Sequence, residues 1–174
     1  MMSQINGLSD EVLIEELWRC CGSRRWADLV MQNRPFESMQ HLLAVADRSW
    51  WSLEGDDWRT AFLAHPRIGD VDALKEKYAK NPDAWEGGEQ SGADDASDAT
   101  LNALKEGNDA YYNKFGHLFL ICATGKSAQE MLNALNERIG NRPDAELLIA
   151  AGEQGKISHL RLNKLIATHT NSQL

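Results

Sequence analysis

The sequence predicts an all-α fold, a single-domain helical bundle of about eight helices over residues 1–174. Three observations support this prediction. Apolar residues recur at intervals of three and four along most of the chain. Residues typical of helix starts and ends bracket these stretches. No convincing alternation of apolar and polar residues indicates a strand.

Four helices are predicted in the first part of the chain. Ser9 is a favoured N-cap before a stretch with helical spacing, and Gly22 stands where that helix would end. Ser23 introduces the next helix, which ends before Pro35 because the residue preceding a proline disfavours helix. Pro66 ends the fourth helix for the same reason. The predicted ranges are 10–21, 24–33, 37–52 and 56–64.

The remainder of the chain predicts further helices around one long polar segment. Asp70 is a candidate cap, and residues 81–98, rich in Gly, Asp, Glu and Ser, predict a polar loop. Ser127 and Glu130 have the spacing of a capping box, and Pro143 suits the first turn of a long last helix. The predicted helices are 70–78, 97–114, 127–140 and one from 143 onward.

The composition excludes several classes of partner. The net charge is −8, so the protein as a whole repels nucleic acid and acidic membrane surfaces. No apolar run is long enough to span a bilayer, and no secretory leader is recognised. Cys20, Cys21 and Cys122 form neither a disulfide framework nor a zinc spacing, so a cytoplasmic location is expected. An anionic substrate would have to be held by a few local positive groups.

A histidine at a predicted helix end is the first candidate for chemistry. His65 is followed by Pro66, with Arg67 and Asp70 close in the sequence. A histidine between a helix end and a rigid proline can act as a positioned acid or base, because the ordinary pKa of its side chain lies near neutrality. Taken alone, the motif favours a simpler interpretation, a helix stop with capping residues.

A carboxylate and an amide lie next to each other in the polar loop. Together, Glu89 and Gln90 can accept and donate hydrogen bonds to a urea-like group, which offers N–H donors and a carbonyl acceptor. On their own, such residues more commonly belong to a solvated loop.

Two further segments leave two interpretations open. The apolar stretch from Phe115 to Ser127 contains Gly116 and Gly125, which would permit close backbone approach to a ligand, although a buried core segment is the favoured interpretation. Arg161 follows a leucine and precedes another on an apolar helix face. Its guanidinium either reaches solvent, the commoner outcome, or grips a carboxylate with two parallel hydrogen bonds.

The other motifs searched for are missing from the sequence. No Gly-rich phosphate loop, nucleophile elbow or dinucleotide fingerprint is present, which disfavours kinases, lipases and dehydrogenases. No metal site is predicted, because no metal-ligand spacing is found among the remaining histidines, which are His41, His117, His159 and His169. Helical spacing assigns several of the six tryptophans to the core, namely Trp18, Trp26 and one of Trp50 and Trp51.

Taken together and in this order, the motifs resemble the decarboxylases of 2-oxo-4-hydroxy-4-carboxy-5-ureidoimidazoline (OHCU). The resemblance covers nearly the whole chain from Leu8 onward, and the joint pattern is far more specific than any of its parts. It is carried by Ala64–Asp70, Glu89-Gln90, Phe115-Gly116 with Phe119 and Ile121, Gly125-Lys126, Arg138-Ile139 with Asn141, Glu146, and Lys156-Ile157 with Leu160-Arg161-Leu162.

The resemblance implies an all-helical homodimer that converts OHCU to (S)-allantoin and carbon dioxide in uric acid degradation, without a cofactor. It implies that His65 and Glu89 are catalytic, with His65 as acid or base. The remaining site residues would bind the substrate, and these are Pro66, Gln90, Leu118, Phe119, Leu120, Ile121 and Arg161.

Elementary chemistry agrees with these roles. Loss of carbon dioxide leaves an electron pair that the adjacent ring C=N accepts, so no external electron sink is required. Glu89 and Gln90 would orient the ureido arm, and Arg161 would hold a carboxylate or ring carbonyl. Backbone N–H groups from Leu118 to Ile121 would bind ring oxygens. Two other classes stay open: a non-catalytic helical module that binds a small anion or peptide, and a metal-dependent hydrolase of the same pathway, which the missing ligand spacing disfavours.

Overall fold

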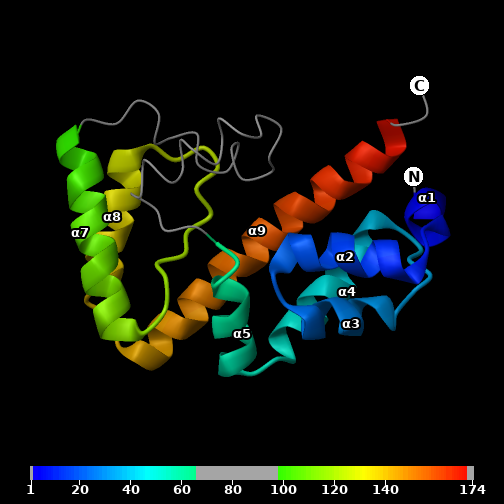
Figure 1. Cartoon of the computed structure of the whole chain (residues 1–174), viewed down its shortest axis with the longest axis horizontal. Coiled ribbons are helices and arrows are strands. Elements are labelled where there is room, and N and C mark those ends of the chain that lie inside the picture. The colour runs from blue at the N-terminus through cyan, green and yellow to red at the C-terminus, as the bar shows by residue number, and fades with distance from the viewer. Residues whose placement is uncertain (1, 66–97, 172–174) are drawn as a thin grey trace. The chain divides into compact units, whose positions relative to one another are not determined.

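The computed structural model of the chain describes residues 2–65 and 98–171, and within these ranges the protein is helical without strands (Figure 1). This confirms the predicted all-α class. The helices are α1 Met2–Gly7, α2 Asp10–Cys21, α3 Arg24–Met31, α4 Met39–Trp51, α5 Gly55–Phe62, α7 Asp98–Phe115, α8 Ala128–Arg138 and α9 Pro143–Asn171.

The helix ends lie close to the predicted positions. The range 10–21 coincides with α2, and the ends of α3, α4, α5, α7 and α8 differ from the predicted ones by no more than two residues, while α9 begins at the predicted Pro143. The predicted helix 70–78 lies outside the described residues. So does the predicted loop 81–98 except for Asp98, with which α7 begins, and the loop stays a prediction.

Serine side chains cap α2, α3, α4 and α8, and three of these caps, Ser9, Ser23 and Ser127, were expected. The hydroxyl of Ser23 accepts a hydrogen bond from the backbone N–H of Trp26 at 3.1 Å, and Ser127 accepts one from Glu130 at 3.2 Å. These bonds satisfy donors that the first helical turn leaves without a partner. At the other end of α2, Gly22 has φ +83, and a Cβ there would lie 2.6 Å from the Cβ of Ala64. Only glycine fits this close, left-handed turn.

Helix α1 was not predicted, because its stability comes from tertiary contacts. Only Ile5 of this short helix is buried, so no helical periodicity marks it in the sequence. The side chain of Asn6 donates to the carbonyl of Phe36 at 2.8 Å and accepts from its N–H at 2.9 Å. The guanidinium of Arg34 donates to the carbonyl of Asn6. Partners about thirty positions away in the sequence therefore hold the helix in place.

The chain divides into two compact units. Of the described residues, unit 1 contains 2–64 and 154–171, and unit 2 contains 65 and 98–153. Helix α9 contributes its first part to unit 2 and its second part to unit 1. The prediction of one domain over residues 1–174 stays a prediction.

Unit 1 packs the amphipathic helices α2, α3 and α4 against one another (Figure 1). Trp26, 1% exposed, donates its indole N–H to the carbonyl of Ala46 at 2.9 Å, so its polar atom is satisfied inside the core. Trp58 does the same with the carbonyl of Trp50 at 3.1 Å. The largest buried apolar side chains of this unit are Trp26, Phe36, Phe62, Ile5, Leu13, Leu17, Leu42 and Leu162.

Unit 2 is built on α7 and α8, which lie side by side and run in the same direction (Figure 1). A Cβ on Gly107 would lie 2.2 Å from a methyl of Leu135, so the glycine allows α7 to approach α8 closely. The non-helical segment 116–127 runs back from the end of α7 to the start of α8. Its residues Phe119 and Ile121 join the apolar core between the helices. The favoured interpretation of this stretch, a buried core segment, is confirmed for these residues.

Candidate functional site

His65 stands just beyond a helix end, as predicted. Helix α5 ends at Phe62, and His65 is the third residue after it, half-buried in a bend of the chain. It is the first residue of unit 2. Three of the other predicted site residues, Pro66, Glu89 and Gln90, lie outside the described residues.

The segment Leu118–Ile121, predicted to bind substrate through its backbone, is buried in unit 2. Leu118 is half-buried, whereas Phe119, Leu120 and Ile121 are 2%, 3% and 7% exposed. The ring of Phe119 meets that of Tyr111 edge to face, with the centroids 5.2 Å apart. These contacts hold the segment by its side chains.

A buried charged network holds the same segment by its backbone. The guanidinium of Arg138 donates to the carbonyl of Leu120 at 2.7 Å, and its Nε and Nη2 donate to one oxygen of Glu146 at 2.8 and 2.6 Å. Glu146 is fully buried, and its other oxygen accepts from the side chain of Asn141 at 2.7 Å. A buried carboxylate is tolerated only when it is paired and hydrogen-bonded, and this one is both.

The hydroxyl of Tyr111 completes the network by donating to Glu146. Burial raises the pKa of this phenol well above its ordinary value, and the hydrogen bond to Glu146 raises it further, while the charge of Arg138 opposes the shift. Tyr111 therefore keeps its proton and remains a donor at physiological pH. The backbone also has a second anchor, because the carboxylate of Glu153 accepts from the N–H of Cys122 at 2.7 Å.

Arg161 is buried instead of extending to solvent. It is 3% exposed, and its Nη1 donates to the carbonyl of Arg19 at 3.4 Å. Its charge also acts on the buried thiol of Cys21. The commoner outcome expected from the sequence, a guanidinium reaching water, is therefore wrong for this residue, because the side chain is buried.

The buried environment of Cys21 shifts the pKa of its thiol. Burial raises its pKa to about 12, whereas a hydrogen bond with Ser158 and the charge of Arg161 act in the opposite direction. The folded protein thus holds the thiol proton more tightly than the unfolded chain does, where the ordinary value is 9.0. The contribution to stability is complete below about pH 9 and is lost as the pH rises toward 12.

We expect this linkage to be measurable in the variant Cys21→Ala. Between pH 8 and pH 10.5, the free energy of unfolding of the wild type should fall by about 2 kcal/mol more than that of the variant, at ~1.4 kcal/mol per pKa unit. Urea unfolding of both proteins at the two pH values measures the difference. Tyr111 titrates in both proteins and cancels. Parallel losses in the two proteins would show that the thiol is not protected by burial.

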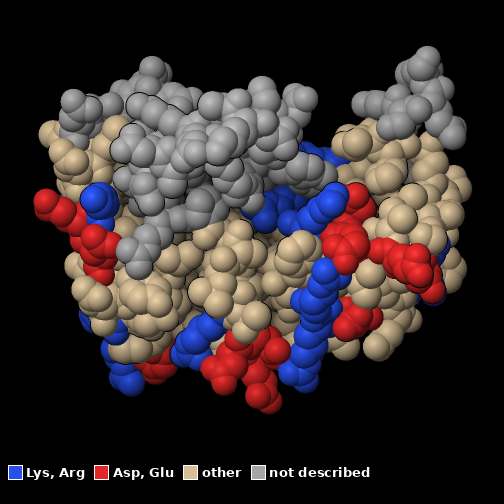
Figure 2. Space-filling model, in the orientation of Figure 1, with Lys and Arg blue, Asp and Glu red and all other residues tan. Residues whose placement is uncertain are grey.

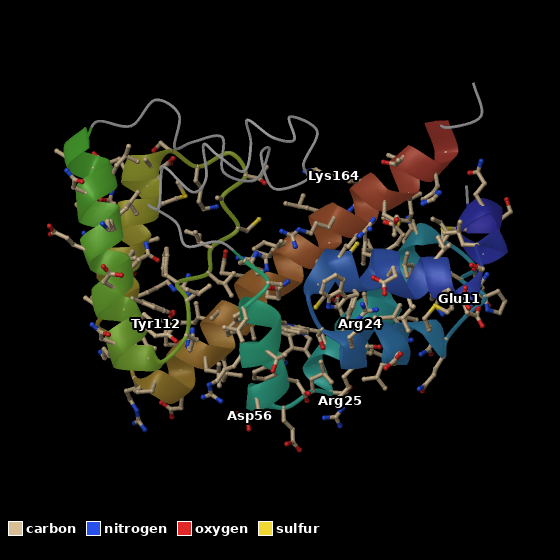
Figure 3. The ribbon with its side chains drawn as sticks, viewed as in Figure 1. Glu11, Arg24, Arg25, Asp56, Tyr112 and Lys164 are labelled. Carbon is tan, nitrogen blue, oxygen red and sulfur yellow. The ribbon has the colours of Figure 1, made fainter. Side chains whose placement is uncertain are left out.

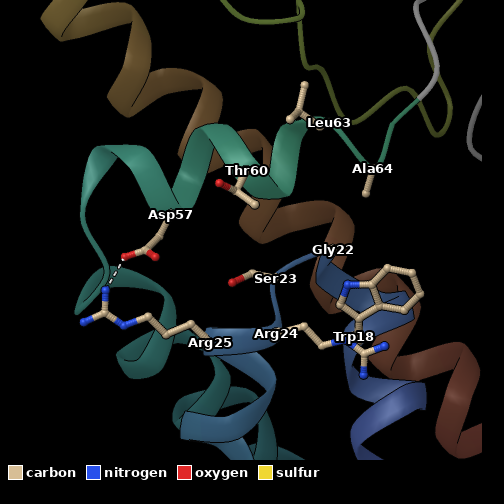
Figure 4. Close-up of a pocket in the computed structure, with 9 residues that line it drawn as sticks. All are labelled: Trp18, Gly22, Ser23, Arg24, Arg25, Asp57, Thr60, Leu63 and Ala64. Carbon is tan, nitrogen blue, oxygen red and sulfur yellow. Dashed lines mark hydrogen bonds and ion pairs between the residues drawn. The ribbon is translucent and has the colours of Figure 1, made fainter.

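A cavity of about 480 Å³ opens on unit 1 between the α2–α3 turn and α5 (Figure 4). The guanidinium of Arg24 stacks over the ring of Trp18, 4.6 Å from its centroid. Trp18 is half-buried in this wall, so its predicted place in the core is wrong. Arg25 donates to Asp57 at 2.8 Å, the ion pair drawn in the close-up.

The charges around this cavity are balanced by close partners. Arg24 also pairs with Glu15 at 2.6 Å, and this hydrogen bond lowers the pKa of the Glu15 carboxyl. Arg24 and Arg25, labelled in Figure 3, therefore each have an acidic neighbour. On the face seen in Figure 2, basic and acidic side chains accordingly stand next to one another on this unit. The cavity has the size of a small-molecule site but carries no strong net charge toward an anion.

The structure brings together only part of the predicted site within each unit. In unit 2 it joins Leu118–Ile121 to Arg138 and Glu146, to which the sequence reasoning assigned no role. The only indication of their importance in the sequence was that both belong to the motifs that carry the family resemblance. Arg161 belongs to unit 1. Among the described residues, no group of three or more His, Cys, Asp or Glu side chains is arranged to hold a metal ion, and no helix of this part is long and apolar enough to cross a membrane.

Comparisons with known proteins agree with one another. A family model described as OHCU decarboxylase matches residues 6–163. The uric acid degradation bifunctional protein TTL of Arabidopsis thaliana is 39% identical over 157 residues, which cover 88% of this chain and 47% of that protein. The 2-oxo-4-hydroxy-4-carboxy-5-ureidoimidazoline decarboxylase of Amia calva is 34% identical over 181 residues, covering 97% of this chain and 98% of that protein. The chain thus spans about half the length of the first relative and nearly all of the second.

The fold is similar to solved structures as well. A crystal structure of OHCU decarboxylase in the presence of (S)-allantoin matches with a TM-score of 0.70 and 36% sequence identity, covering 92% of this chain and 99% of that one.

Proposed function

The chain belongs to the OHCU decarboxylase family, and from this membership we propose that it converts 2-oxo-4-hydroxy-4-carboxy-5-ureidoimidazoline to (S)-allantoin and carbon dioxide in uric acid degradation. The observation that carries the proposal is the family match over residues 6–163. The relative from Amia calva, named for this activity, supports it because it is covered over 98% of its length.

In the proposed reaction, the bond between the ring carbon and its carboxylate breaks, and the electron pair moves into the adjacent ring C=N. The ring nitrogen that receives the electron pair gains a proton. The hydroxyl on the carbon that carried the carboxylate loses its proton and becomes the carbonyl of allantoin, and the neighbouring ring carbon gains a proton, so the reaction takes up one proton overall. His65 is proposed to take or steer the hydroxyl proton. Because the ring itself accepts the electrons, the proposal includes no cofactor.

The other site residues are proposed to bind and orient the substrate. Glu89 is the second catalytic residue, and with Gln90 it would hold the ureido arm, beside Pro66. Arg161 would hold a carboxylate or ring carbonyl, which its enclosed position suits because charge-assisted hydrogen bonds are strongest away from water. The N–H groups of Leu118–Ile121 would bind ring oxygens.

We also propose that the protein is cytoplasmic and forms a homodimer. A measurement of its mass in solution tests the dimer. In the part of the chain that the structure describes, no disulfide joins the three cysteines, which suits a reducing compartment. Unit 1 carries exposed apolar side chains suited to an interface: Leu63 is 72% and Trp51 49% exposed. Trp51 stacks edge to face on Trp58 with centroids 5.6 Å apart, which gives the surface a rigid aromatic part.

A turnover assay tests the proposed activity. Substrate made freshly by urate oxidase and hydroxyisourate hydrolase should disappear faster in the presence of the protein, with (S)-allantoin formed and carbon dioxide released. The activity should survive exhaustive chelation. Loss of activity that zinc or manganese restores would contradict the cofactor-free reaction and favour a metal-dependent hydrolase. No acceleration at all would favour a non-catalytic module that binds a small anion or a peptide.

A further inference from the structure

We infer that the buried ion pair of Arg138 and Glu146 is a positioning device for the backbone segment 118–121, and through it for the substrate. The inference rests on the proposed function, in which this segment binds ring oxygens. Arg138 and Glu146 do not touch the substrate in this scheme. They act through the backbone that they hold.

The guanidinium of Arg138 joins the segment to a fixed point. Its Nε and Nη2 bond Glu146 at 2.8 and 2.6 Å, while its Nη1 bonds the carbonyl of Leu120 at 2.7 Å. All three are short, charge-assisted hydrogen bonds in a dry interior, where such bonds are strong. A planar guanidinium with several N–H groups can serve both partners at once, whereas a lysine ammonium is a single point charge.

The fixed point is itself held from several sides. Glu146 is fully buried, it accepts from Asn141 at 2.7 Å, and it accepts from the hydroxyl of Tyr111. Arg138 also lies over the ring of Phe119, with 4.6 Å between its Cζ and the ring centroid. The orientation of the guanidinium is therefore over-determined, as the supporting shell of a precise site requires.

The pattern of backbone bonds decides which groups remain for a ligand. The anchored groups are the carbonyl of Leu120 and the N–H of Cys122, which bonds Glu153 at 2.7 Å. The N–H groups of Phe119 and Ile121 take part in none of the hydrogen bonds found between described residues. The anchors thus leave these two donors for an oxygen acceptor.

The variant Arg138→Lys tests the inference. Lysine keeps a charge beside Glu146 but cannot also hold Leu120, so the segment should loosen without loss of the buried charge pair. The dissociation constant for allantoin should rise about tenfold or more, and kcat/KM should fall by a similar factor, mainly through KM. Amide hydrogen exchange at Cys122, whose N–H is bonded to Glu153, should become about tenfold faster as the segment loosens. Tyr111→Phe, which removes only one hydroxyl, should shift both quantities about threefold in the same direction.

A core variant of the same unit is the matched control. Leu135→Val removes one methylene from the α7–α8 core and no bond to the segment, so it should lower the melting temperature but leave the allantoin dissociation constant unchanged. Wild-type affinity and wild-type amide exchange in Arg138→Lys would overturn the inference. If Arg138→Lys does not fold, the same two readouts in Tyr111→Phe decide. An inactive wild type would instead refute the proposed function, while amide exchange would still report on the positioning.

Discussion

Replacement of His65 by asparagine is expected to lower turnover of OHCU by about a hundredfold or more and to leave the affinity for allantoin nearly unchanged. Asparagine has a similar size and keeps a donor and an acceptor, but it cannot take up or release a proton near neutral pH. The proposed role of His65 is proton transfer as carbon dioxide leaves. An effect on kcat without an effect on product binding is therefore its signature.

Steady-state kinetics and calorimetric titration with allantoin measure the two quantities. His41→Asn is the matched control, because His41 is half-buried, as His65 is. His41 lies on α4, accepts a hydrogen bond from the N–H of Glu37 at 3.1 Å and has no proposed role in the reaction. The control should keep wild-type turnover. Wild-type turnover in His65→Asn would show that the acid and base assignment is wrong, even if the decarboxylase activity is confirmed.

Replacement of Arg161 by glutamine is expected to weaken the binding of carboxylate-bearing substrate analogues by about 2 kcal/mol or more, on the order of thirtyfold. The side chain is 3% exposed, so its interactions with an anion would be little screened by water. Glutamine can donate one hydrogen bond but brings no charge. Allantoin, which has lost the carboxylate, should be affected less than the anionic analogue.

Two companion variants make this result specific. Arg161→Lys should restore little of the affinity, because a point charge does not reproduce the planar, two-pronged grip of a guanidinium. Arg19→Gln should bind as the wild type does, since the Arg19 side chain is 62% exposed and pairs only weakly with Glu16 at 3.3 Å. Equal binding of the anionic analogue by Arg161→Gln and the wild type would exclude Arg161 as the anion-holding residue.

The local signals in the sequence were sufficient for most of the helices. Ser9 and Gly22 bracket α2 because a capping hydroxyl and a left-handed turn are decided by a few neighbouring residues. The same reasoning placed the start of α8 at Ser127. It failed for α1, whose bonds to Arg34 and Phe36 come from far along the chain.

The candidate site was less accessible to sequence reasoning, since burial is a property of the packed chain. Nothing local distinguishes a leucine-flanked arginine that reaches solvent from one that is enclosed, as Arg161 is. In the same way, helical spacing assigned Trp18 to the core, although it forms the wall of a cavity under Arg24. Both outcomes depend on which neighbouring helix covers the residue.

The sequence by itself determined the all-α class, the helix ends and, through the combined motifs, the family. Those features follow from periodicity, capping and residue identity, which are written along the chain. Only the tertiary structure decided that Arg138, Glu146 and Tyr111 meet around the carbonyl of Leu120. Tyr111 lies on α7, Arg138 on α8, Glu146 on α9, and Leu120 in the segment between α7 and α8. The charges of Arg138 and Glu146 can be buried only where all their hydrogen-bonding partners come together.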